Sequence, residues 1–148
     1  MIQILSILGG VLCGAVLATQ VGVNLQLSNA VGNSVTSTLF SFVVGAIGLC
    51  VYVLIARAPL PPIASLVQIP AWKWTGGLLG ATYVLLTIVI GPRLGAAALL
   101  ALVVTGQMVA AMVLDHNGWL GFTQHTISLW RVLGAALLVT GTVVILRH

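Results

Sequence analysis

The sequence predicts an all-α integral membrane protein with five transmembrane helices. Of its 148 residues, 60% are hydrophobic and only 4% are charged, whereas soluble proteins carry about 25% charged residues. The apolar residues form long continuous runs, unlike the short alternating segments of a membrane β-barrel. In lipid such runs must be helices, which satisfy their own backbone hydrogen bonds. Because one span needs about 20 residues, the apolar residues of this chain suffice for about five spans. The low charged fraction excludes a soluble domain.

The spans are separated by links with turn-forming composition, and together they form a single domain over residues 1–148. The expected spans cover residues 2–25, 35–56, 74–91, 95–114 and 129–146.

Each link contains residues that end a helix or form a turn. Residues 27–34 are polar, and residues 57–73 contain four prolines, which cannot continue a helix. Gly-Pro-Arg-Leu-Gly over residues 91–95 is expected to form a tight turn, and residues 115–128 contain an Asn-Gly turn signal.

The basic residues are almost evenly divided between the two membrane sides. Arg57, Lys73 and Arg131 flank the side of the N-terminus, and Arg93 and Arg147 flank the other side. By the positive-inside rule, the membrane side with more Lys and Arg residues near the span ends faces the cytoplasm. Two interpretations stay open: a weak preference for a cytoplasmic N-terminus, or dual topology, in which copies insert both ways.

All four tryptophans fall at the expected span ends on the side of the N-terminus, where an aromatic belt at the headgroup level is the preferred explanation. They are Trp72, Trp74, Trp119 and Trp130.

Small residues recur at helical spacing along the spans. Such rows let helix backbones approach closely in a membrane, so we expect them to pack helices. The glycines concerned are Gly10, Gly14, Gly45, Gly76, Gly77, Gly80, Gly134 and Gly141.

Polar residues inside the spans are the best indicators of function, because each is costly to bury. Gln20 and Asn24 lie four residues apart and share one face of the first span, about half a turn from its glycine row. Gln107 lies in the fourth span and Tyr83 in the third. They could converge on an uncharged substrate site near the midplane. Alternatively, the amides only hold helices together, and Tyr83 is a packing residue.

Asp115 is the only acid and lies near the end of the fourth span, on the same side as Arg131. We expect the two to pair, either as a structural contact at the interface or as a gate or coupling site. Asp115, His116 and His125 fit no standard metal-ligand spacing, and no nucleophile set or phosphate loop is present. The chain is therefore interpreted as neither an enzyme nor a metal or cofactor protein, and its scattered cations exclude nucleic acid as a partner.

Several motifs together resemble the YdcZ-like family of the drug/metabolite transporter superfamily, over essentially the whole chain. They are Gly14, Gln20 and Asn24-x-x-Leu27; Ser41-Phe42 and Gly45; Trp74 and Gly76-Gly77-x-x-Gly80; Pro92-x-x-Gly95; Gly106-Gln107; Asp115-x-x-Gly118; and Arg131, Gly134 and Gly141.

This resemblance implies an exporter of the bacterial inner membrane that works by alternating access. It implies that the chain is a five-helix half unit, completed by a second copy inserted upside down, as an antiparallel homodimer, or by a paralogue. The chain is also similar to small multidrug resistance proteins, but its first span lacks their glutamate. A neutral, zwitterionic or weakly anionic solute therefore fits better than a cation.

Two other functions stay open from the sequence. A passive channel would need a continuous polar lining, and the spans contain few polar residues. A membrane assembly subunit would use its glycine faces to dock a larger partner.

Overall fold

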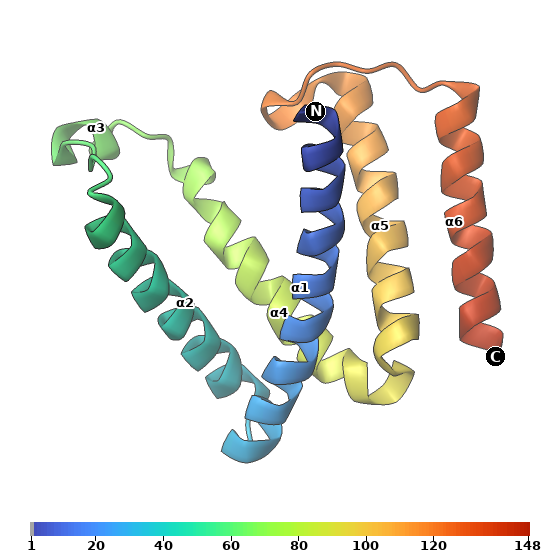
Figure 1. The fold of residues 1–148 in the computed structure, drawn as a ribbon, viewed down its shortest axis with the longest axis horizontal. Helices are drawn as coiled ribbons and strands as arrows, with labels where there is room; N and C mark the ends of the chain where they lie inside the picture. Colours follow the sequence, from blue (N-terminus) through green and yellow to red (C-terminus); the bar gives the residue numbers. More distant parts are fainter. Residues whose placement is uncertain (1) are drawn as a thin grey trace. The chain divides into compact units, whose positions relative to one another are not determined.

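The computed structural model describes residues 2–148, in which five helices are long and apolar enough to cross a membrane (Figure 1). This confirms the predicted all-α membrane fold. The long helices are α1 (Ile2–Val31), α2 (Ser34–Ala56), α4 (Thr75–Leu94), α5 (Ala96–Asn117) and α6 (Leu129–Arg147). The short helices are α3 (Ile63–Val67), η1 (Ala71–Trp74) and η2 (Trp119–Gly121).

The helix boundaries follow from local capping chemistry. The side chain of Asn33 accepts a hydrogen bond from the backbone N–H of Thr36 and begins α2, and the Ser128 hydroxyl accepts one from Arg131 N–H at the start of α6. These contacts satisfy backbone donors that a helix leaves free at its N-terminus. At the other end, Gly118 terminates α5 with a positive φ of 63°, a conformation that glycine adopts without strain.

The first predicted link is wrong in its extent. Residues 27–34 were expected to be a polar loop, but α1 continues to Val31, and only Gly32 and Asn33 separate it from α2. The Ser28 and Ser34 hydroxyls lie 3.2 Å apart across this turn. Polar residues here mark the closely packed end of a helix pair and not a loop.

The expected turn over residues 91–95 is also shorter than predicted. α4 runs through Pro92 to Leu94, and the change of direction occurs at Gly95, whose φ is 77°. A proline in the last turn removes one backbone donor without ending the helix abruptly. In the link over residues 57–73, Pro62 and Pro70 directly precede α3 and η1.

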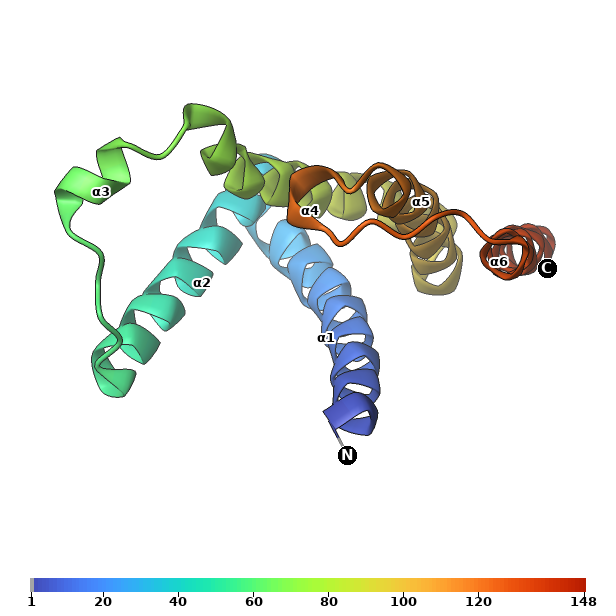
Figure 2. The same cartoon turned by 90° about the horizontal axis from the view of Figure 1, so that it is seen from above.

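The chain divides into two compact units, one ending at Ile90 and one running from Gly91 to His148. In the first unit, α1 and α2 meet at their short turn and diverge away from it, as both views show (Figure 1, Figure 2). The ring of Phe42 on α2 lies 3.5 Å from where a Cβ on Gly80 of α4 would be placed. In the second unit, α5 and α6 lie side by side and antiparallel.

Most buried residues of the first unit belong to the α1–α2 pair and to the C-terminal half of α4. They are Val21, Asn24, Ser28, Ser37, Thr38, Val84, Thr87 and Ile88. Five of these eight are polar, whereas the long apolar side chains elsewhere on the helices are exposed. Exposed apolar surface is the expected state of a protein whose solvent is lipid.

Candidate functional site

A groove between α1 and α2 is the candidate solute site. It consists of two adjoining hollows, of about 530 Å³ and about 390 Å³, that share Gln20 and Ser41. We call it the α1–α2 groove. The larger hollow is lined by Leu12, Ala15, Val16, Thr19, Gln20, Val23, Asn24 and Ser41. The smaller one is lined by Gln20, Ser41, Phe42, Gly45, Ala46 and Leu49.

The helical register of α1 places the two predicted amides on this groove. Gln20 and Asn24 are one turn apart, so their side chains lie on the same face, and Ser41 on α2 lines the groove with them. The remaining lining is mostly apolar, and no ionisable acid or base lines either hollow. A mostly apolar pocket with a few polar groups is typical of small-molecule sites.

Asn24 is the most unusual residue of the groove. The residue is almost completely buried, at 3% exposed, and its amide nitrogen Nδ2 has no hydrogen-bond partner among residues 2–148. Its backbone carbonyl accepts a hydrogen bond of 3.2 Å from the Ser37 hydroxyl, so the backbone is fixed while the side-chain donor is free. A buried unpaired donor costs about 1–3 kcal/mol, and buried polar groups are otherwise nearly always paired.

Of the other two predicted binding residues, Tyr83 does not line the groove and Gln107 belongs to the other unit. Tyr83, on α4 of the first unit, has a buried hydroxyl without a hydrogen-bond partner among residues 2–148, but it lines neither hollow. Gln107 is exposed on α5, in the second unit. Of the four predicted contacts, the structure therefore places Gln20 and Asn24 together.

Ser41 is a polar groove residue that the sequence did not single out for binding. In the sequence it belongs to a row of small residues on the second span, and such rows usually indicate packing. The signal available was a hydroxyl in the apolar run that follows the amide-bearing helix. Which face of α2 meets that helix depends on the two-residue turn between them.

The predicted packing glycines mostly face open space within this chain. A Cβ added to Gly10, Gly14 or Gly45 would meet no atom within 4 Å, whereas one on Gly80 would touch Phe42. The buried face of α1 is instead the one that carries Asn24, with Val21 and Ser28. Within residues 2–148, Gly80 alone of the predicted packing glycines would bring a Cβ within 4 Å of another helix, and the packing role of the others stays a prediction.

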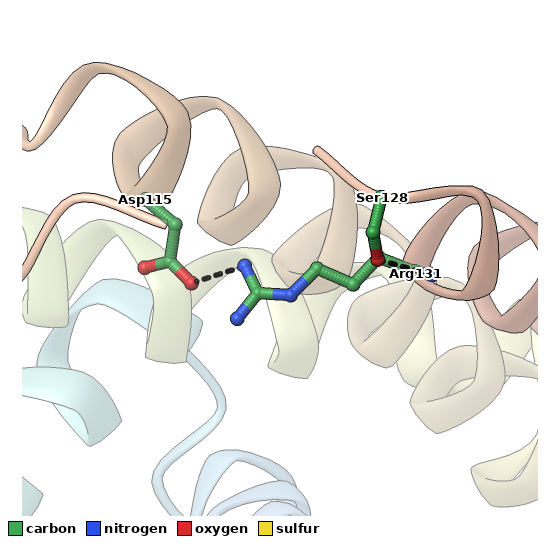
Figure 3. Close-up of polar contacts among 3 residues, drawn as sticks. All are labelled: Asp115, Ser128 and Arg131. Carbon is green, nitrogen blue, oxygen red and sulfur yellow. Dashed lines mark hydrogen bonds and ion pairs between the residues drawn. The ribbon is translucent and has the colours of Figure 1, made fainter. Parts of the chain in front are cut away.

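Asp115 and Arg131 form the predicted ion pair, which joins the last turn of α5 to the first turn of α6 (Figure 3). The guanidinium Nη1 donates to carboxylate Oδ2 over 3.1 Å. The two side chains are 27% and 39% exposed for Asp115 and Arg131, respectively. Among residues 2–148, no group of three or more His, Cys, Asp or Glu could hold a metal ion.

The five candidate spans define a multi-pass membrane protein. The model of a drug/metabolite transporter family, described as "Putative inner membrane exporter, YdcZ", matches residues 5–144. The chain therefore belongs to this YdcZ family and is located in the inner membrane, as the motifs of the sequence predicted. No curated protein sequence and no solved structure matches the chain.

Proposed function

We propose that this chain is one half of a carrier that exports a small solute without net positive charge, and that the α1–α2 groove binds the solute. The observation that carries the proposal is the unpartnered amide nitrogen of Asn24, which is buried beside Gln20 and Ser41. This donor is closed to solvent in the present conformation, and in the proposal it gains a partner when helix movement brings it to an acceptor group of the bound solute.

The chemistry of the groove supports a neutral, zwitterionic or weakly anionic solute. Amides and a hydroxyl offer donors and acceptors without formal charge. A cation would lose its hydration without meeting a carboxylate, which is costly in an apolar site. The larger hollow of about 530 Å³ has the size of a typical small-molecule pocket, about 300–1,000 Å³.

Alternating access requires a second half, and we propose that an inverted second copy supplies it. The basic residues support this arrangement, because three flank one membrane side and two the other, which gives almost no orientation signal. Inverted repeats that move around a central site are a common design of membrane carriers.

The test of the site compares two identical substitutions on α1. Asn24→Leu removes the unpartnered donor, and Asn29→Leu makes the same change at an exposed position outside the groove. Cells that produce each variant are loaded with a panel of radiolabelled uncharged solutes that carry a carbonyl group, and efflux is measured with tetraphenylphosphonium as the cationic comparison. We expect Asn24→Leu to slow efflux of the uncharged probes about tenfold, the effect of losing about 1.4 kcal/mol of binding.

Asn29→Leu should leave efflux unchanged at equal protein levels in the membrane. Equal efflux by both variants would remove Asn24 from the site. Faster export of the cation than of every uncharged probe would reject the proposed solute class.

The orientation of the chain tests the inverted pair. The two native cysteines, Cys13 and Cys50, are free and are replaced by serine, and His148→Cys provides one label site. A membrane-impermeant thiol reagent is applied to intact and to permeabilised cells. Labelling of about half of the molecules in intact cells is expected from the weak charge bias; labelling of all or none would exclude an antiparallel homodimer.

A further inference from the structure

A second groove lies between α5 and α6 and belongs to the unit that does not contain the α1–α2 groove. It begins at the ion pair as a hollow of about 370 Å³, and a further hollow of about 380 Å³ shares Leu138 with it. We call both together the α5–α6 groove. The first hollow is lined by Met108, Ala111, Met112, Asp115, Arg131, Gly134, Ala135 and Leu138. The second is lined by Ala97, Leu100, Ala101, Val104, Leu137, Leu138, Gly141, Thr142 and Ile145.

The α5–α6 groove is apolar along most of its length, with Thr142 as the polar member of the second hollow, and is charged at one end. Ala111, Gly134 and Ala135 leave room between the two helices, and a Cβ on Gly134 would meet no atom within 4 Å. Met108 and Met112 add flexible apolar surface, which adapts to ligands of irregular shape. Asp115 and Arg131 are the charged members of the lining. This shape fits an elongated molecule with an apolar body and a polar head.

The ion pair has unused binding capacity. One contact joins it, from Nη1 of Arg131 to Oδ2 of Asp115, and both side chains are partly exposed. In Figure 3 the second terminal nitrogen of Arg131 and the other carboxylate oxygen of Asp115 point away from this contact. Arginine has several N–H donors and a carboxylate several acceptor positions, so the pair can bind an anion and an ammonium group together.

The charged end lies where lipid headgroups are expected. Asp115 is in the last turn of α5, and Arg131 is in the first turn of α6. Trp119, in the link between these helices, and Trp130, in the first turn of α6, are exposed. Exposed tryptophans at span ends mark the headgroup level of a bilayer. The apolar length of the groove then extends from this level into the hydrocarbon region.

We infer that the α5–α6 groove binds a phospholipid with a zwitterionic amine headgroup. Its phosphate contacts Arg131, its ammonium contacts Asp115, and one acyl chain lies along the groove. The charges of the site favour a zwitterionic headgroup, because the site has one cationic and one anionic side chain, whose nearest atoms are 3.1 Å apart. An anionic lipid would gain Arg131 but would also face the carboxylate of Asp115. The inference does not depend on the proposed transport function.

The experiment measures lipid binding to the purified full-length protein. The protein is delipidated in detergent, and phosphatidylethanolamine or phosphatidylglycerol is added at a series of concentrations. Native mass spectrometry counts bound lipid, and the shift in unfolding temperature gives the affinity. We expect phosphatidylethanolamine to bind about tenfold more tightly than phosphatidylglycerol, the effect of one charge-assisted hydrogen bond.

Two pairs of variants connect this binding to the groove. Gly134→Leu fills the groove and should abolish the preference for phosphatidylethanolamine over phosphatidylglycerol. Gly106→Leu adds the same side chain to a glycine of α5 outside the groove and should leave this preference unchanged. Arg131→Gln should weaken phosphatidylethanolamine binding about tenfold. The exchange Asp115→Arg with Arg131→Asp keeps an ion pair at the same place and should restore the preference even where Arg131→Gln folds poorly.

Three results would overturn the inference. Equal affinity for the two lipids would mean that the headgroup pair is not recognised. An unchanged preference in Gly134→Leu would place the lipid elsewhere. Cross-linking of two chains through Ala135→Cys in the lipid-loaded protein would show that a second copy covers the groove.

Discussion

The α5–α6 pair and the unit that contains α1 and α2 differ in whether their buried polar side chains have hydrogen-bond partners. Between α5 and α6, the Thr105 and Thr142 hydroxyls lie 2.7 Å apart, and Thr142 also donates to the carbonyl of Ala101 over 3.2 Å. Asp115 and Arg131 close the other end of the pair. Within residues 91–148, no buried side-chain nitrogen or oxygen lacks a partner. The unit that contains α1 and α2 has two such atoms, Nδ2 of Asn24 and the Tyr83 hydroxyl.

Under the proposed function, this difference separates polar residues that stabilise a helix pair from a polar residue, Asn24, that is available to bind. A hydroxyl whose donor and acceptor are both used adds a helix contact of about 0.6 kcal/mol in measured membrane proteins. A buried donor without a partner does the opposite and lowers stability. Proteins retain such violations mainly at functional sites. The unpaired group therefore indicates function more reliably than the number of polar residues in a span.

The largest expected effect concerns the point where α1 and α2 are in closest contact. Ser37 is completely buried, and its hydroxyl donates to the Asn24 carbonyl. Ser37→Leu should lower the free energy of unfolding by about 1–3 kcal/mol, because a larger side chain has no room there. The measurement is the unfolding temperature of the purified protein in detergent. Ser6→Leu, at an exposed position of α1, is the matched control; a similar loss in both variants would mean that the α1–α2 contact is not a packed junction.

The second prediction compares how the unpaired amide of Asn24 and the paired hydroxyl of Thr142 contribute to stability. Asn24→Leu removes a buried donor without a partner and should leave stability unchanged or raise it by up to about 1 kcal/mol. Thr142→Val removes a hydroxyl that has two partners and should lower stability by about 1 kcal/mol. Both variants are measured by the same unfolding assay. A loss of stability in Asn24→Leu equal to that in Thr142→Val would show that Asn24 is a structural residue.

Much of this organisation could be predicted from the sequence because it depends on local patterns. Apolar runs determine the five spans, and a spacing of four residues places Gln20 beside Asn24. The Asp115–Arg131 pair was predictable because a link joins the ends of the two neighbouring spans that carry them. Ser41 was not predictable as a groove residue, because its position depends on how α2 crosses α1 and therefore on the short turn between them. The open space beside the glycine row of α1 could not be predicted for the same reason.

The smallest expected effect is the coupling between Asp115 and Arg131. Because both side chains are partly exposed, water and salt weaken their attraction, and exposed ion pairs contribute about 0.2–1 kcal/mol. A double-mutant cycle with Asp115→Asn, Arg131→Gln and the double variant should give a coupling energy in this range, and the coupling should decrease as salt is added. A larger, salt-independent coupling would mean that the pair is shielded in the assembled protein. In that case the α5–α6 pair would be held together mainly by its charges, and the threonine contacts at its other end would be secondary.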